Sequence, residues 1–187
     1  MPSENISILR KFIMEYGSIL GLCWIAVFAC YVVGFRTQNG IFMLSGLMGL
    51  VGLLAVEFFL GCRIKKRSVQ LEIKSSFFFT YMNVLGIFMY ACLLCGCLEY
   101  IYFAFIDKGA LFEAIQTMLD STEIKQLYTQ MGMSAYYKQI TDTIDELSML
   151  SAFEKAMILF NQNFAVGLFM SVPVSIAAHF YRPAMLK

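Results

Sequence analysis

The stretch 64–74, IKKRSVQLEIK, separates two apolar runs that are each long enough to cross a membrane. Together with the position just before it, this stretch gathers five basic residues: Arg63, Lys65, Lys66, Arg67 and Lys74. By the positive-inside rule, a basic connection between two membrane-length segments stays in the cytoplasm. We therefore expect this connection to be cytoplasmic, and its position orients every other segment.

The composition of the chain is typical of a membrane protein. Of its 187 residues, 59% are hydrophobic and only 14% are charged, and the mean hydropathy is +0.69. A chain of this length holds about four spanning helices of roughly 20 residues each and one small extramembrane piece. The net charge of +1 gives no indication of a nucleic-acid partner.

The apolar runs predict an all-α, polytopic membrane protein in which one domain, a four-helix bundle, occupies the whole chain. The predicted transmembrane helices lie at about 12–35, 41–62, 77–105 and 153–181. The first run is too long for the apolar part of a signal peptide, and no small-residue cleavage motif closes it. With the basic connection inside, both termini are expected in the cytoplasm.

Glycine spacing indicates where helices can pack closely. Gly17 and Gly21 lie about one turn apart in the first span, and Gly46, Gly49 and Gly52 recur at every third residue in the second. Small residues at such spacing allow the backbones of two membrane helices to approach. We assign all five glycines to helix packing, and for Gly17 and Gly21 general packing is favoured over a specific dimer face.

Residues 107–155 form a long stretch without a membrane-length apolar run. This stretch has eight acidic residues against four lysines, which agrees with a location outside the cytoplasm. Apolar residues recur there at helical spacing, with Gly132 and Ser134 between two such patterns. We expect two amphipathic helices, at about 107–152, that cap the outer end of the bundle. Ser151 and Glu154 then match the S-x-x-E capping box that begins a helix.

Polar side chains inside the spans fall at two depths. The inner group consists of Glu15, Glu57, Asn83 and His179, and the outer group of Glu99, Asn161 and Asn163. Lipid offers no hydrogen bonds, so each group should turn inward and find partners within the bundle. We predict that the inner four form one cluster and that Glu99 contacts segment 161–163. Both a functional and a purely structural role are compatible with these carboxyl groups.

The sequence shows no metal, cofactor or catalytic signature. Cys92, Cys95 and Cys97 are close in sequence, but at about 100° per residue Cys97 points away from the other two. Buried cysteine commonly behaves as a small apolar residue. The chain has one histidine, and neither G-x-S-x-G nor H-E-x-x-H occurs in it. We therefore expect no metal, no cofactor and no catalytic residue.

The order of several segments resembles a known family. These segments are YGSILGL at 16–22, RIKKR at 63–67, EYIYFAFID at 99–107 and GMSAYYKQ at 132–139. The pattern resembles the bacterial membrane family called domain of unknown function 4199, which is common in Bacteroidetes. The resemblance covers nearly the whole chain, implies a location in the bacterial inner membrane and carries over no catalytic residue. Members are often encoded near membrane glycosyltransferases that act on polyprenyl-phosphate sugars, so the resemblance implies such an enzyme as a partner.

Three functional classes follow, and the first is favoured. It is a non-enzymatic membrane subunit that packs with, anchors or regulates another membrane protein, such as a polyprenyl-phosphate glycosyltransferase. The second is a small carrier or channel that works as an oligomer. The third is a membrane protein that binds a lipid or acts on a lipid-linked substrate. In each class the expected partners are membrane lipids and either another membrane protein or further copies of this chain.

Overall fold

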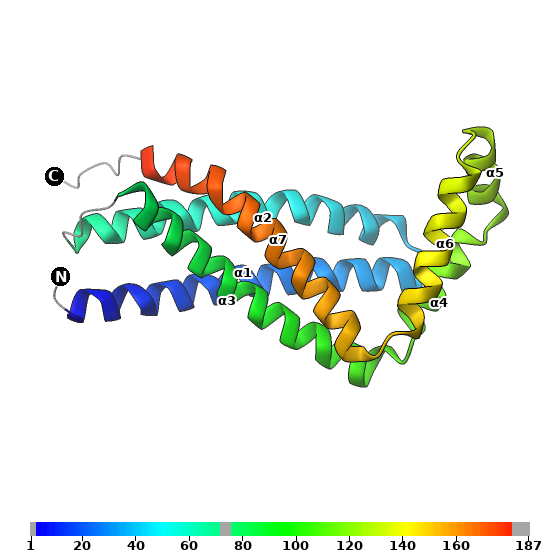
Figure 1. Ribbon diagram of the computed structural model, residues 1–187, viewed down its shortest axis with the longest axis horizontal. Coiled ribbons are helices and arrows are strands. Elements are labelled where there is room, and N and C mark those ends of the chain that lie inside the picture. Colours follow the sequence, from blue (N-terminus) through cyan, green and yellow to red (C-terminus); the bar gives the residue numbers. More distant parts are fainter. Residues whose placement is uncertain (1–2, 72–75, 181–187) are drawn as a thin grey trace.

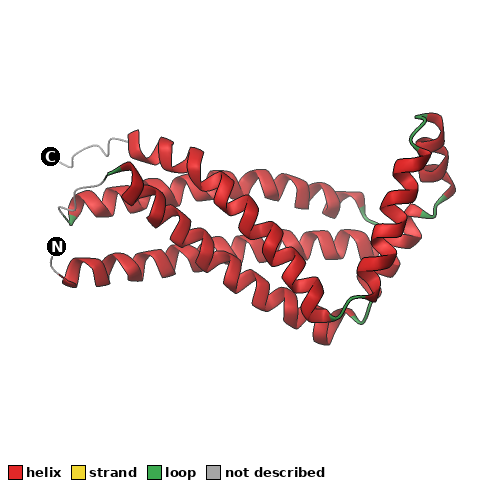
Figure 2. Ribbon diagram, in the orientation of Figure 1, coloured by secondary structure: helices red, strands yellow, loops and turns green. Residues whose placement is uncertain are grey.

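The computed structural model describes residues 3–71 and 76–180, and every regular element in these ranges is a helix (Figures 1 and 2). The long helices are α1 (Ser3–Thr37), α2 (Gly40–Gln70), α3 (Phe77–Ile101) and α7 (Ala152–Phe180). A π-helical turn, Tyr102–Asp107, continues α3 without a break. Each of these four helical segments is long and apolar enough to cross a membrane. The predicted all-α class with four spans is thus confirmed.

Helix α2 is longer than the sequence indicated: it continues to Gln70, whereas its expected end was near residue 62. No glycine or proline interrupts the chain between Arg63 and Gln70, so nothing in the local sequence stops the helix. The predicted basic loop is therefore in large part helical, and 63–67 lie on the last turns of α2. Lys74 lies outside the described residues.

The four long helices form two pairs that cross. Helices α1 and α2 are antiparallel neighbours, and α3 and α7 run together across them (Figure 1). Helix α1 also packs along α3, whereas α2 meets α7 near Gly61, beside Val174 and Ala178. The first and last described residues lie at the same end of the bundle as the end of α2 and the start of α3 (Figure 1).

Glycines of α1 allow the close contact with α3. A Cβ atom added at Gly17 would lie 2.7 Å from Tyr90 Cβ and 2.9 Å from the Ile87 carbonyl oxygen, and one added at Gly21 would lie 3.3 Å from the carbonyl oxygen of Ala91. The backbones therefore approach within a distance that only glycine permits. Without a hydrophobic force between helices in lipid, such close packing is a main source of helix association.

The glycines of α2 do not share one packing face. Gly46 lies against the ring of Tyr31 and Gly49 against Val27, both on α1, whereas Gly52 has no neighbour within 4 Å of an added Cβ. At about 100° per residue, six residues leave Gly52 about 120° away from Gly46 around the helix. Gly52 therefore packs against no other described helix of this chain, and its assignment to helix packing stays a prediction.

Three helices, not two, form the cap at the other end of the bundle. They are α4 (Ala110–Leu119), α5 (Thr122–Gln130) and α6 (Ser134–Met149). Helix α5 was not predicted because it is short, nine residues with the sequence TEIKQLYTQ, and has only three apolar side chains, Ile124, Leu127 and Tyr128. Its start is set by Ser121, whose hydroxyl accepts a hydrogen bond from the Ile124 amide at 3.4 Å. The predicted capping box is present, since Ser151 N donates to Glu154 Oε2 at 2.8 Å and Glu154 N to Ser151 Oγ at 3.3 Å.

Asp107 joins the membrane bundle to the cap. This buried carboxylate accepts hydrogen bonds from the Tyr102 hydroxyl at 2.7 Å and from the amides of Gly109 at 3.1 Å and Leu111 at 3.0 Å. It thereby holds the π-helical turn and the first turn of α4 at a fixed angle. Leu111 and Phe112 of α4 then form a second apolar core with Val32 and Phe103, which closes the end of the bundle.

The α1–α3 contact can be tested with two matched glycine substitutions. Gly17→Ala should lower the free energy of unfolding by about 1–3 kcal/mol, because the new methyl group meets the backbone of α3. Gly52→Ala places the same group in open space and should keep or slightly raise stability, since alanine favours a helix by about 1 kcal/mol over glycine. Thermal unfolding in detergent measures both, and equal midpoints for the two variants would contradict the proposed packing.

The orientation predicted from the basic residues can be tested by cysteine labelling. Gln70 and Thr129 are both exposed, at the basic end of α2 and in the cap. In a variant without the six native cysteines, Thr129→Cys should react with an impermeant reagent added outside intact cells, and Gln70→Cys should not. Ser68 is unsuitable as a reporter, because its side chain is only 1% exposed. Labelling of Gln70→Cys alone would show the inverted topology.

Candidate functional site

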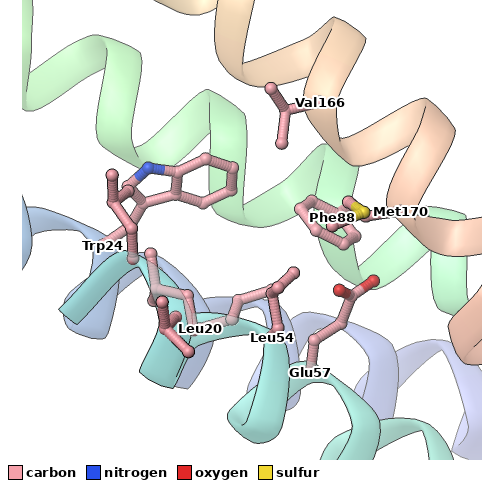
Figure 3. Close-up of a pocket in the computed structure, with 10 residues that line it drawn as sticks. Leu20, Trp24, Leu54, Glu57, Phe88, Val166 and Met170 are labelled. Carbon is pink, nitrogen blue, oxygen red and sulfur yellow. The ribbon is translucent and has the colours of Figure 1, made fainter. Parts of the chain in front are cut away.

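A cavity of about 300 Å³ lies among α1, α2, α3 and α7, and Glu57 is one of the residues that line it (Figure 3). Apart from Glu57 its wall is formed by aliphatic and aromatic side chains and one methionine: Leu20, Trp24, Leu50, Val51, Leu53, Leu54, Phe88, Val166 and Met170. Its size is at the lower end of the range of small-molecule sites, about 300–1,000 Å³. The cavity lies where α2 and α7, which touch near Gly61, begin to separate toward the cap (Figure 1).

The walls of the cavity come from helices fixed by other contacts. The indole of Trp24 on α1 packs edge-on against Phe88 of α3, with ring centroids 5.7 Å apart. Phe88 in turn lies over Gly167 of α7, where an added Cβ would be 2.6 Å from its ring. These three helices therefore form a rigid back wall, and α2 covers it from one side (Figure 3).

Glu57 is the one ionisable side chain that lines this cavity. It is 1% exposed, and both of its carboxyl oxygens lack a hydrogen-bond partner among the described residues. Its carboxyl group points toward the space beside Phe88 and Met170 (Figure 3). A carboxyl group placed in apolar surroundings without a partner is costly, and in a membrane segment it is a candidate for a functional residue. The cavity is suited to an apolar molecule that forms one hydrogen bond with the Glu57 carboxyl group.

The predicted inner polar cluster is not formed. Glu15 is exposed on α1, because the face toward the bundle is taken by its neighbours Tyr16 and Gly17. Asn83 is buried but donates to the carbonyl oxygen of Phe79 in its own helix at 2.6 Å. His179 is half-buried, and its ring packs edge-on against Phe77 with centroids 6.1 Å apart.

The inner polar cluster was wrongly predicted because α2 is longer than the sequence indicated. Since α2 ends at Gln70, Glu57 lies 13 residues before that end (70 − 57), or about 20 Å along the helix. His179 lies one residue before the last residue of α7. The two side chains are therefore at different depths, and Glu57 reaches the level of Met170 instead.

The predicted outer contact is present, and Asn163 makes it. The Nδ2 of Asn163 donates to Glu99 Oε1 at 3.3 Å, which links α7 to α3. The Sγ of Cys95, one turn earlier on α3, approaches the same oxygen at 3.3 Å. Asn161 is exposed and takes no part, because it lies about 200° around α7 from Asn163. Glu99 thus differs from Glu57, whose two oxygens both lack a partner.

The cysteines and acidic residues that the structure describes show no arrangement that would hold a metal. Cys92 and Cys95 are buried in the main core, and Cys97 is exposed. Within the described ranges, no three histidine, cysteine or acidic side chains come together as a possible metal site. The residue that sequence reasoning overlooked is Asp107, for which Gly109 two positions later is the signal of a polar turn.

The Glu99–Asn163 contact predicts different effects for two substitutions at one position. Glu99→Gln keeps an acceptor and adds a donor, so folding should be retained. Glu99→Leu leaves the Asn163 amide without its partner and should lower the free energy of unfolding by about 1–2 kcal/mol. The control Asn161→Leu changes an exposed residue and should have no such effect. Equal thermal midpoints for wild-type and Glu99→Leu in detergent would rule out a stabilising contact.

Comparison with known proteins places this arrangement in a family. The chain matches the sequence profile described as "Protein of unknown function (DUF4199)" over residues 15–179, which includes the cap, the second and third spans and most of the first and fourth. No curated protein and no solved structure matches the chain. The resemblance noted from the segments of the sequence is therefore confirmed. This chain belongs to the DUF4199 family, whose function is unknown.

Proposed function

We propose that this protein is a non-enzymatic integral membrane protein that binds a lipid-type ligand in the Glu57 cavity. The observation that carries the proposal is the Glu57 carboxyl group, which is buried, points into an apolar cavity and has no partner among the described side chains. A ligand with a hydroxyl, amide or amine group would supply the missing hydrogen bond. Its apolar body would fill the space lined by leucine, valine and aromatic side chains.

The mouth of the cavity favours a ligand that arrives from the membrane. Val51 on α2 is 62% exposed and Val166 on α7 is 50% exposed, although both line the cavity. Both helices are long and apolar enough to span a membrane, where these exposed apolar side chains would border the lipid. A molecule dissolved in the bilayer can therefore enter between α2 and α7 without passing through water.

A binding role fits the cavity better than catalysis or transport. General acid–base chemistry commonly pairs two titratable groups with different environments, and Glu57 is the one such group among the cavity-lining residues. A carrier or channel for a polar solute needs polar groups along a path, whereas the wall around Glu57 is apolar. The protein is accordingly proposed to bind its ligand without transforming it.

A location in the bacterial inner membrane, with both termini in the cytoplasm, is part of this proposal. It is supported by the basic residues at the end of α2 and by Arg10 and Lys11 at the same end of α1. The acidic cap at the opposite end agrees with this orientation.

A second candidate function is that of an accessory subunit for another membrane protein, for example a polyprenyl-phosphate glycosyltransferase. The observation in its favour is the outer face of α2, where Gly52 has open space beside it and Met48 and Val51 are 63% and 62% exposed. A glycine without a neighbour leaves room for a helix of a partner or of a second copy. A complex lost in Gly52→Leu and kept in Glu57→Leu would favour this candidate.

The Glu57 proposal predicts that binding and stability respond in opposite ways. Glu57→Leu should reduce the fraction of protein that retains a bound amphiphile by about tenfold, because a hydrogen bond to a polar group of the ligand is lost. The same change should leave the thermal midpoint equal or higher, since it removes a buried group that has no partner. Native mass spectrometry from mild detergent measures the bound fraction, and thermal unfolding measures stability.

Two further variants serve as controls for this experiment. Glu57→Gln keeps a hydrogen-bonding group in the cavity and should retain most of the bound amphiphile. Glu15→Leu removes an exposed carboxyl group on the neighbouring helix and should leave binding unchanged. A lower thermal midpoint for Glu57→Leu together with unchanged binding would indicate a structural role and contradict the proposal.

A further inference from the structure

A second hollow lies at the basic end of the bundle, away from the Glu57 cavity. It has a volume of about 430 Å³ and is lined by Tyr16 of α1 and by seven residues of α2: Phe58, Phe59, Cys62, Arg63, Lys66, Arg67 and Gln70. Three of these eight side chains are cationic, and none is acidic. The positive-inside rule explains why basic residues lie at this end, but it does not require them to surround one hollow.

Two of the three cations are held in place by aromatic rings. The guanidinium of Arg63 lies 4.8 Å from the ring centre of Phe59, and that of Arg67 lies 4.7 Å from the ring centre of Phe12 on α1. Arg67 also donates through Nη1 to Gln70 Oε1 at 3.1 Å. These contacts leave most of the guanidinium donors unused while they restrict the positions of the side chains.

No carboxylate neutralises these cations in the part of the chain that the structure describes. None of Arg63, Lys66 and Arg67 forms an ion pair there. All three side chains are exposed, so an anion can reach them. Uncompensated arginines with free donors are well suited to a phosphate group, which they bind through paired hydrogen bonds.

The hollow changes from apolar to cationic along the axis of α2. Phe58 and Phe59, which are 43% and 54% exposed, lie on the membrane side, and Arg63, Lys66 and Arg67 follow toward the end of the helix. A phospholipid has the same order of groups, with chains in the membrane and a phosphate at the boundary. Basic pockets beside transmembrane helices are known to bind anionic headgroups.

We propose that this hollow binds the phosphate of an anionic phospholipid headgroup, with Arg63, Lys66 and Arg67 around the phosphate and Phe58 and Phe59 along the chains. The site lies at a different place from the Glu57 cavity, so the two proposals stand or fall separately. The ligand here carries negative charge and stays at the membrane boundary, whereas the Glu57 ligand is taken up between α2 and α7.

The test compares lipid binding by native mass spectrometry of the purified full chain titrated with phosphatidylglycerol or with phosphatidylcholine. The wild-type protein should prefer phosphatidylglycerol. The double variant Arg63→Gln/Arg67→Gln should bind phosphatidylglycerol about 25-fold more weakly, since each basic side chain near the membrane surface contributes about fivefold. Binding of phosphatidylcholine should not change. The single variant Lys66→Gln alters an exposed side chain that has no packing role, and it should weaken binding about fivefold.

The matched control is the double variant Arg10→Gln/Lys11→Gln. It removes the same charge at the same end of the bundle from exposed positions that do not line the hollow. This control should weaken phosphatidylglycerol binding by less than about threefold, as expected for dispersed surface charges. Equal losses in the two double variants, or no preference for phosphatidylglycerol in the wild type, would overturn the proposal. Displacement of the lipid by an equal concentration of soluble glycerol phosphate would overturn the assignment to a lipid.

Discussion

The close contact between α1 and α3 at Gly17 and Gly21 determines how the remaining helices can pack. Because these glycines bring the two backbones together, α3 is held near the centre of the bundle, and α7 packs along its other side. Helix α2 contacts α1 along its length but meets α7 near Gly61. The two helix pairs cross rather than run parallel, so α2 and α7 diverge toward the cap (Figure 1). The Glu57 cavity lies between α2 and α7, where the two helices diverge.

The buried acidic residues of the bundle divide into two kinds, and their surroundings explain the difference. Glu99 and Asp107 accept hydrogen bonds from side chains or amides of neighbouring segments, and each joins two helical elements. Glu57 has the same chemistry but lies among apolar side chains, with no partner among the described residues. A polar group that stabilises the fold has its partners within the fold, whereas one without partners is suited to a ligand.

The cap seals one end of the bundle through a small number of contacts. Leu111 and Phe112 of α4 pack on Val32 and Phe103, and the amine of Lys155 lies 4.8 Å from the centre of the Phe112 ring. Lys155 also donates to the carbonyl oxygen of Ser148 at 2.9 Å, which ties the end of α6 to the start of α7. Ile144 and Leu147 of α6 also pack against this apolar core, whereas α5 lies farther from the bundle (Figure 1). The part of the cap nearest the membrane is therefore the part that is fixed.

The sequence by itself determined the features that depend on local composition and spacing. Apolar length identified the four spans, because a helix must satisfy its own backbone hydrogen bonds in lipid and needs about 20 apolar residues to cross. The S-x-x-E pattern at Ser151 located the start of α7, because a capping box is a contact within one turn. The contact of Glu99 with Asn163 was also predictable, since both residues lie at similar distances from the ends of two consecutive helices.

Only the tertiary structure decided how these helices turn and cross. Glu57 and His179 are at different depths because α2 continues past residue 62, where it was expected to end. No residue near position 62 indicates that the helix continues to Gln70. Gly52 faces away from its chain and Glu15 faces outward because the rotation of each helix is set by packing with its neighbours. The cavity at Glu57 and the basic hollow at Arg63 arise from the angle between helices, and that angle depends on contacts between residues far apart in the chain.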